Sequence, residues 1–325
     1  MSQHKAYGQQ TVWDEALRAV SQKARRKTRF LFELTDWFDF EVFRPFLETE
    51  FRPHKLGQSS YDPLLLFKVV MLQKWYGLSD PGVEELIYDR LSFRDFLGLG
   101  LHDPIPDETT ICNFRNRLVK SGLYERLFTL LNQQLTERGV LVKGGSIVDA
   151  TFVEAPKGKR QDGSKVCQGA DFGHKGHGQS VHVNGNFDKL IVSLEVTSAR
   201  PHDSQHIGDV LTGEESVLYA DSAYGAKEYR AVLAEVGIED QIIEKASAHH
   251  PLTEDQKARN REKSRVRSRG EHIFATWKTV QGFVRVRYDN LWSNRADAFF
   301  HATAYNLRRG LFLSKNDLYQ RPCTV

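Results

Sequence analysis

The sequence pattern changes at Gly144, and this change constrains the fold more than any other feature. Before it, helix start and stop signals follow one another; after it, short β-branched segments alternate with helical ones. The first of these, GGSIVDATFVEAP, is short and bounded by glycine, which predicts a strand with Asp149 in its middle. We expect a helical domain over residues 1–140 and an α/β domain over residues 141–325.

Helix signals repeat through the first domain. Asp62 and Pro63 begin an apolar segment and Gly77 stands near its end, the order in which cap residues occur at helix ends. The same signals predict further helices from the Asp-Pro start at residues 80–81, from Asp107 to Gly122 with Ile111, Phe114 and Leu118 at helical spacing, and on to Gly139.

Strands and helices alternate in the second domain. The segment GQSVHVNGNFDKLIVSLEV predicts a hairpin with its turn at Asn184–Phe187. The elements expected after it are a helix within residues 201–213, a strand ending at Asp221, a helix at 225–237, a strand at 239–244, a long helix at 253–280 with Gly270 tolerated inside it, and a helix from Asn294 to Leu313. The fold class is therefore α/β, with a mixed five-stranded sheet flanked by helices, and the absence of an internal repeat excludes a solenoid.

Composition indicates a soluble, cytoplasmic protein. Of 325 residues, 40% are apolar and 27% charged, and no apolar run approaches the roughly 20 residues that a membrane span needs. The segment MSQHKAYGQQTVWDEALRAV shows no signal-peptide pattern. Cys112, Cys167 and Cys323 are far apart, which excludes a disulfide framework or a cysteine zinc site. We expect no membrane partner.

Basic residues cluster, although the net charge is only +3. They gather at Lys23–Arg29, Lys157–Lys165 and Lys257–Arg269, whereas acidic residues gather at Glu33–Phe43. One such run is usually a solvated surface, but three of them favour a polyanionic partner.

Three acidic residues lie at predicted positions where α/β proteins commonly have catalytic or ligand-binding side chains. Asp149 lies within the first strand, where β-propensity disfavours aspartate, Asp221 ends a later strand, and Glu271 lies on the long helix. Acids at strand ends and on a neighbouring helix can converge on one point. Carboxylate oxygens suit Mg²⁺ or Mn²⁺, and two such ions about 4 Å apart are the usual arrangement for phosphodiester cleavage. The alternative is that these are three surface charges among 42 acidic residues.

The helix around Glu271 has one ionic and one apolar side. Arg267, Glu271 and Lys278 fall within roughly 40° of one another on a helical wheel. Arg267 could hold the Glu271 carboxylate through a salt bridge, and Lys278 could reach a phosphate. A solvated helix face with an ordinary ion pair fits equally well. The apolar side comprises Val266, Ile273, Trp277 and Val280.

Histidines also gather in one region, which makes a zinc site conceivable. His202 and His206 have the spacing of one helical turn. No HExxH motif is present, so surface or hydrogen-bonding histidines are favoured. The set comprises His174, His177, His182, His202 and His206.

The segments IVDATFVEAP, VLYADSAYG and RSRGEHIFATWK resemble the three catalytic blocks of DDE transposases of bacterial insertion sequences, in particular insertion sequence family five. The segment PDETTICNFRNRLVKSGLYERLF is similar to their N-terminal helical region, and the resemblance covers about residues 40–312. It implies a ribonuclease-H-like core in which Asp149, Asp221 and Glu271 are catalytic and bind two Mg²⁺ or Mn²⁺ ions.

The family signature around the glutamate reads Tyr, two residues, Arg, three residues, Glu, six residues, Lys. Arg267, Glu271 and Lys278 match it, but Ser264 occupies the tyrosine position, which puts a tyrosine-specific DNA contact in doubt. Only 50 positions separate Asp221 from Glu271, too few for the large inserted domain of some related transposases.

The activity implied by the resemblance is metal-dependent DNA cleavage and strand transfer at the terminal inverted repeats of the element, in the cytoplasm on the nucleoid, by a protein that is a dimer on DNA. A catalytically silent DNA-binding relative and a general ribonuclease-H-like endonuclease are the alternatives. The residues expected to contact DNA or support the site are Arg267 and Lys278 beside Glu271, Lys157, Lys159, Arg160, Arg265 and Arg269 in the basic runs, and Arg115 and Arg117 on a recognition helix that could equally be a packing helix.

Overall fold

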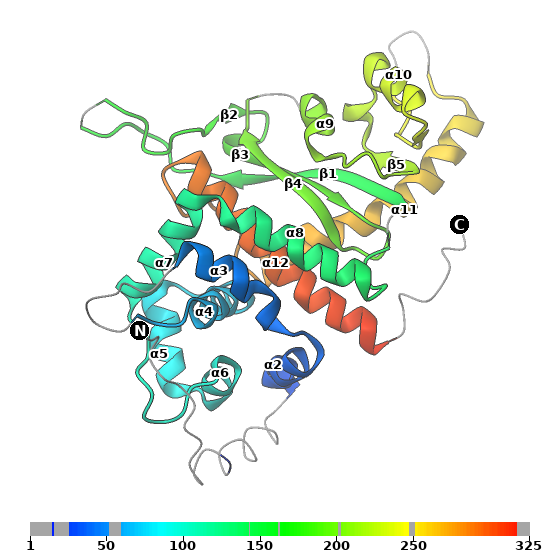
Figure 1. Cartoon of the computed structure of the whole chain (residues 1–325). Helices are drawn as coiled ribbons and strands as arrows, with labels where there is room; N and C mark the ends of the chain where they lie inside the picture. The colour runs from blue at the N-terminus through cyan, green and yellow to red at the C-terminus, as the bar shows by residue number, and fades with distance from the viewer. Residues whose placement is uncertain are drawn as a thin grey trace. The chain divides into compact units, whose positions relative to one another are not determined.

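The chain forms two compact units, Met1–Leu131 and Asn132–Val325. The computed structural model in Figure 1 describes residues 15, 26–51, 60–142, 144–161, 163–200, 203–246 and 251–316. Among the residues discussed above, Lys23, His202 and Cys323 lie outside this part of the chain. The division between units falls within a helix, a few residues before the predicted boundary at 140.

The first unit is helical, as predicted. Asp62 caps the helix that starts at Pro63, and Gly77 ends it in the left-handed conformation at φ 65°. Asp107 likewise accepts a hydrogen bond from the Thr110 amide at 2.6 Å. These cap predictions are confirmed. The helices are α2 (Arg26–Trp37), η1 (Phe40–Phe43), α3 (Arg44–Glu50), α4 (Pro63–Tyr76), α5 (Asp80–Asp89), α6 (Leu91–Leu97), α7 (Glu108–Ser121) and α8 (Leu123–Glu137), the last of which crosses the division.

The start of α5 differs from the prediction by one residue. Its cap is Ser79, whose hydroxyl accepts from the Gly82 amide at 3.2 Å, and Asp80 is already the first helical residue. The Asp80 carboxylate instead binds the guanidinium of Arg115, with contacts of 2.5 and 2.8 Å. A serine directly before Asp-Pro supplies the capping oxygen and leaves the aspartate available for this ion pair.

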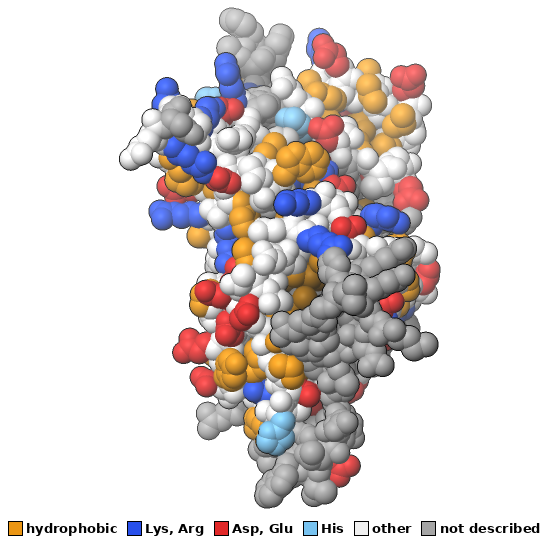
Figure 2. Space-filling model, turned by 60° about the vertical axis from the view of Figure 1, so that its left-hand side comes forward, with side chains coloured by type: hydrophobic (Ala, Val, Ile, Leu, Met, Phe, Trp, Pro, Cys, Tyr) orange, Lys and Arg blue, Asp and Glu red, His pale blue; other side chains and the backbone are white. Residues whose placement is uncertain are grey.

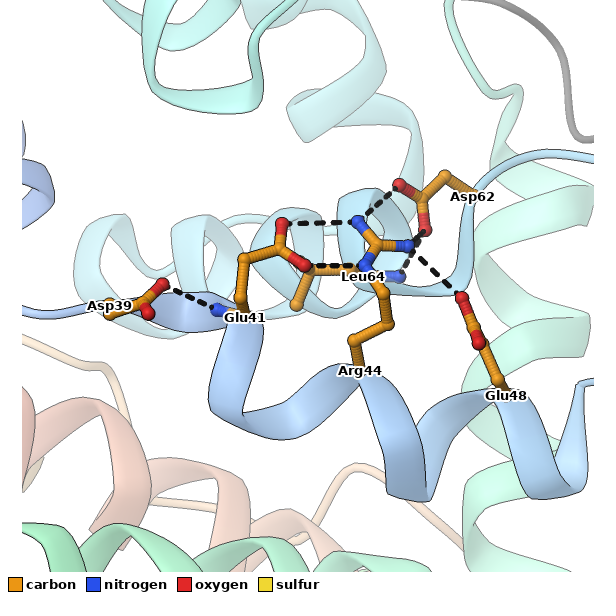
Figure 3. Close-up of polar contacts among 6 residues, drawn as sticks. All are labelled: Asp39, Glu41, Arg44, Glu48, Asp62 and Leu64. Carbon is orange, nitrogen blue, oxygen red and sulfur yellow. Dashed lines mark hydrogen bonds and ion pairs between the residues drawn. The ribbon is translucent and has the colours of Figure 1, made fainter.

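An arginine with three carboxylates links α3 to the start of α4 (Figure 3). The Arg44 guanidinium contacts Asp62 at 3.0 and 3.1 Å, and it also pairs with Glu41 and Glu48. The same Asp62 carboxylate accepts from the Leu64 amide at 2.9 Å, so one side chain caps α4 and ties it to α3. Hydrogen bonds to Glu41 and Asp62 raise the pKa of Arg44, which stays charged.

The second unit is α/β, as predicted. Within the described residues, no helix is long and apolar enough to cross a membrane. The strands are β1 (Gly145–Glu154), β2 (Asp171–Gly173), β3 (Gly176–Gly185), β4 (Ile191–Ser198), β5 (Val217–Ala220) and β6 (Glu239–Asp240). The helices are η2 (Asp203–His206), α9 (Ile207–Val210), η3 (Ser222–Tyr224), α10 (Lys227–Glu235), α11 (Glu254–Thr279) and α12 (Leu291–Lys315).

The sheet is mixed and has the order β2-β3-β1-β5-β6, with β4 also paired to β3. β1 runs antiparallel to β3 and parallel to β5. The mixed sheet expected from the sequence is confirmed, but β2 was missed and the strand predicted at 239–244 pairs over only two residues. Both are short edge strands, which carry too few residues for an alternating pattern.

The hairpin turn lies later than predicted. Asn184 and Gly185 still pair with β4, and the turn occupies residues 186–190, where Lys189 has φ 65°. Asn184 is buried, and its amide donates to the Val210 carbonyl at 3.1 Å and to Glu215 at 2.9 Å. These bonds explain why a turn-favouring residue remains inside a strand.

Helices cover both faces of the sheet (Figure 1). α9 and α10 contribute Ile207 and Leu233 to a core that includes Val148 of β1 and Leu218 of β5. On the opposite face, α11 packs against β1 and β5, and α12 packs against β4.

The contact between α11 and the sheet is unusually close. A Cβ added to Gly270 would lie 3.0 Å from Ile147 Cγ2, and one added to Gly185 would lie 2.9 Å from Ile273 Cδ1. Gly270 is therefore not merely tolerated in the helix; it allows α11 to approach β1. Ile273 and Trp277 are buried as predicted, whereas Val280 follows the last helical residue and is 44% exposed.

Gly270→Leu tests this packing. The added side chain must displace α11 from β1, so we expect a loss of about 1–3 kcal/mol in the free energy of unfolding, measured by urea denaturation. Ala275→Leu, on an exposed position of the same helix, should change it by less than about 0.5 kcal/mol. Equal effects of the two substitutions would contradict the close contact.

Candidate active site

The two aspartates lie side by side on neighbouring strands, Asp149 within β1 and Asp221 directly after the end of β5. β1 and β5 run parallel, and Val148 pairs with Ala220, so the next positions are Asp149 and Asp221. Asp149 is largely buried, with 20% of its side chain exposed. Asp221 follows the last residue of β5, and its Oδ1 accepts from the Ala223 amide at 2.7 Å. β1 continues beyond the end of β5, which leaves residues 149–153 without a β5 partner, and Glu154 bonds to the segment 284–286.

Glu271 lies on α11, and Arg267 connects it to β1. Arg267 Nη2 is 3.5 Å from Glu271 Oε1, so the predicted ion pair is present. Arg267 Nη1 also lies 3.3 Å from Asp149 Oδ2, a contact that helix periodicity alone did not reveal. One guanidinium therefore bridges two of the three predicted acidic residues, while Glu271 itself is 61% exposed.

The carboxylates act on one another electrostatically. Burial raises the pKa of Asp149, and the negative charges of Asp221 and Glu271 raise it further. A hydrogen bond from the Ala150 amide and the charge of Arg267 oppose this shift. The site is thus a concentration of negative charge that one arginine only partly neutralises.

No described group of three His, Cys, Asp or Glu residues is gathered closely enough to hold a metal ion. The chemistry of the carboxylates nevertheless fits hard cations, and the Arg267 guanidinium is a cation lying between Asp149 and Glu271. The guanidinium therefore occupies a position where the two carboxylates favour positive charge. The zinc site that the sequence made conceivable gains no support. The rings of His182 and His206 lie 5.0 Å apart in a tilted arrangement, and His206 pairs with Asp209, in agreement with the favoured hydrogen-bonding role.

The basic run of α11 does not face the carboxylates as a whole. Arg265 and Arg269 are exposed, but they lie on a different side of the helix from Arg267. Arg269 acts electrostatically on Asp188, in the turn after β3. Lys278 is exposed near the end of the helix.

The loop between β1 and β2 presents its basic residues on the surface. Lys157 and Lys159 are exposed, and Arg160 forms an ion pair with Asp289 while remaining 46% exposed. These positions leave all three side chains accessible to a polyanion.

The two arginines of α7 have different surroundings. Arg115 is 5% exposed and bound to Asp80, so it holds α7 to α5 and is not available to DNA in this conformation. Arg117 is 47% exposed, pairs with Glu50 and lies over the Phe51 ring at 4.8 Å. The packing alternative therefore applies to Arg115.

Comparison with known protein families matches both units. Residues 19–117 match a family described as "Transposase domain (DUF772)", and residues 141–307 match one described as "Transposase DDE domain". The second match covers just over half of the chain and contains Asp149, Asp221 and Glu271. Neither description specifies insertion sequence family five, which stays a prediction.

Asp149→Asn tests the electrostatic strain at the site. Because the folded-state pKa of Asp149 lies above its usual value, the ionised form destabilises the fold, and its removal should add about 0.5–2 kcal/mol at neutral pH. The gain should shrink as pH falls through the folded-state pKa and vanish below the pKa of the unfolded chain. Urea denaturation without added metal, as a function of pH, measures this; a loss of stability at neutral pH would contradict it.

Proposed function

The chain belongs to the DDE transposases, and on that premise we propose that it binds the terminal inverted repeats of its own insertion sequence, cuts DNA there and joins the ends to a target. The observation that supports this best is the position of Asp149 and Asp221 side by side on the parallel strands β1 and β5, with Arg267 of α11 in contact with both Asp149 and Glu271.

Asp149, Asp221 and Glu271 would hold two Mg²⁺ or Mn²⁺ ions. Their oxygens are the ligands that such ions prefer, and Arg267 already places positive charge between two of them. Bound ions supply activated water and stabilise charge at the attacking and leaving oxygens of the phosphodiester.

Each of the surrounding groups has a positioning role in this proposal. The Ala223 amide fixes the Asp221 carboxylate, and the Ala150 amide donates to Asp149 at 2.9 Å. Arg267 opposes the rise in the pKa of Asp149, and its two contacts hold Asp149 and Glu271 near one another before the substrate arrives. Glu271 is the most exposed of the three acids and has the most freedom to turn toward the aspartates.

The chain would make its DNA contacts through exposed cations. Each phosphate contact releases counterions, so binding should weaken steeply as salt concentration rises. Arg115 is excluded by its burial. The proposed contacts are Lys157, Lys159, Arg160, Arg265, Arg269 and Lys278 in the second unit and Arg117 in the first.

The proposed reaction has two steps. Water attacks a phosphodiester at the end of the element and releases a 3′-hydroxyl, which then attacks a phosphodiester of the target DNA. The second attack forms one P–O bond as another breaks, so it needs no covalent enzyme intermediate. Two element ends must be joined to one target, and we therefore propose a dimer on DNA.

A nicking assay tests the proposal. With Mg²⁺ and duplex DNA carrying the terminal repeats that flank the gene, the protein should nick the repeat end. Asp149→Ala, Asp221→Ala and Glu271→Ala should each reduce the rate by roughly a thousandfold or more. Glu254→Ala is the matched control, because this glutamate also lies on α11 and pairs with a basic residue, Lys257, but is 83% exposed and at the far end of the helix.

The outcome separates the three functions that the sequence left open. Repeat-specific binding without nicking would show a silent DNA-binding protein, and nicking that ignores the repeats would show a general endonuclease. Full activity of Asp149→Ala or Asp221→Ala would contradict the assignment of the carboxylates.

A further inference from the structure

A cavity of about 530 Å³ is lined in part by residues adjacent to the two aspartates, although neither aspartate lines it. Its lining includes Ala150, which follows Asp149 in the chain, and Ala223, whose amide donates a hydrogen bond to Asp221. Along β1, Thr151 shares the side of Asp149, whereas Ala150 and Phe152 face the opposite side. All three line the cavity, so it wraps around the edge of β1 that β5 leaves open.

The far wall of the cavity combines an aromatic ring with cations. Phe172, the central residue of β2, is 69% exposed. Lys157 Nζ lies 5.7 Å from the centre of its ring. His174, Lys175 and Arg200 are exposed and also line the cavity. Figure 2 shows exposed lysine and arginine side chains, with hydrophobic atoms between them, on the face that it brings forward.

The Phe172 ring lies on a backbone that is closely packed against its neighbours. Phe172 pairs with His177 of β3, and the two rings lie 4.9 Å apart. A Cβ on Gly173 would lie 2.1 Å from the carbonyl oxygen of Ala199, the residue after β4, and one on Gly178 of β3 would lie 2.2 Å from the carbonyl oxygen of Val153 in β1. An exposed aromatic side chain on a fixed backbone is preorganised for stacking.

We propose that this cavity binds an unpaired nucleotide of the DNA, with its base stacked on Phe172 and its phosphates held by Lys175 and Arg200. The inference rests on the proposed function, since it takes DNA as the substrate, and it adds a single-stranded feature to that substrate. The volume lies within the roughly 300–1,000 Å³ typical of pockets for small molecules, enough for one nucleotide.

The composition of the cavity favours this ligand over an apolar one. An aromatic face with surrounding cations is the arrangement that binds single-stranded nucleic acid, because every base offers a π-face and every linkage a negative charge. Lys157 is exposed, so its ammonium group can move to a phosphate when a base stacks on the Phe172 ring in its stead. The cavity starts at the neighbours of Asp149 and Asp221, so the nucleotide bound there lies close to the phosphodiester that they act on.

Fluorescence anisotropy with two DNA probes tests the inference, using the full chain. One probe is a blunt duplex and the other is the same duplex with a single-stranded overhang. We expect wild-type protein to prefer the overhang probe, and Phe172→Ala to weaken binding of that probe on the order of tenfold while changing blunt-duplex affinity by less than about twofold. Phe172→Trp should retain or strengthen the preference.

Phe312→Ala is the matched control. This phenylalanine is 49% exposed and also has a cation over its ring, Arg309 at 5.0 Å, but it lies on α12 and does not line the cavity. It should leave both affinities unchanged. Thermal unfolding of each variant checks that the fold is intact, as expected for exposed positions.

The possible outcomes distinguish the two proposals. Wild-type protein that binds both probes equally, or Phe172→Ala that weakens both equally, would overturn the nucleotide site and leave the transposase function standing. Wild-type protein that binds neither probe would overturn DNA binding itself and this inference with it.

Discussion

The close packing of α11 on β1 is the constraint on which the catalytic unit depends. Gly270 lets the helix approach Ile147, and Ile273 fills the space above Gly185. This contact fixes the height and rotation of the helix, so that Arg267, one turn before Glu271, reaches Asp149 on the strand. A larger residue at position 270 would separate the helix from the aspartates. The contact of Arg267 with Asp149 thus depends on packing as well as on charge.

Arg267 balances the charge that this packing brings together. Burial and two neighbouring carboxylates make the ionised form of Asp149 costly, and a guanidinium between Asp149 and Glu271 reduces that cost. The contacts of 3.3 and 3.5 Å are long for a charge-assisted hydrogen bond, and its buried Nε makes no hydrogen bond within the described residues. Such an arginine holds Asp149 and Glu271 near one another loosely, which is compatible with the proposed metal site.

Much of this organisation could be predicted from sequence, because its signals are local. Asp62, Gly77 and Gly122 delimit helices through their own backbone and side-chain chemistry. The strand–helix order and the spacing of Arg267 from Glu271 are also local. What failed depends on contacts distant in sequence: Asn184 remains in β3 because of Val210 and Glu215. Arg115 is buried by its ion pair with Asp80, 35 residues earlier in the chain, which sequence alone did not reveal. For Phe172, an aromatic residue close to basic residues in the sequence was the signal that was missed.

The central claim is that Asp149, Asp221 and Glu271 together form the metal site of this transposase. Anomalous diffraction from crystals grown with Mn²⁺ and DNA tests it most directly. Two peaks bounded by these carboxylates, with Arg267 displaced from Asp149, are the predicted result. Crystals in which Mn²⁺ is absent from the aspartates and Arg267 still bridges Asp149 and Glu271 would contradict it.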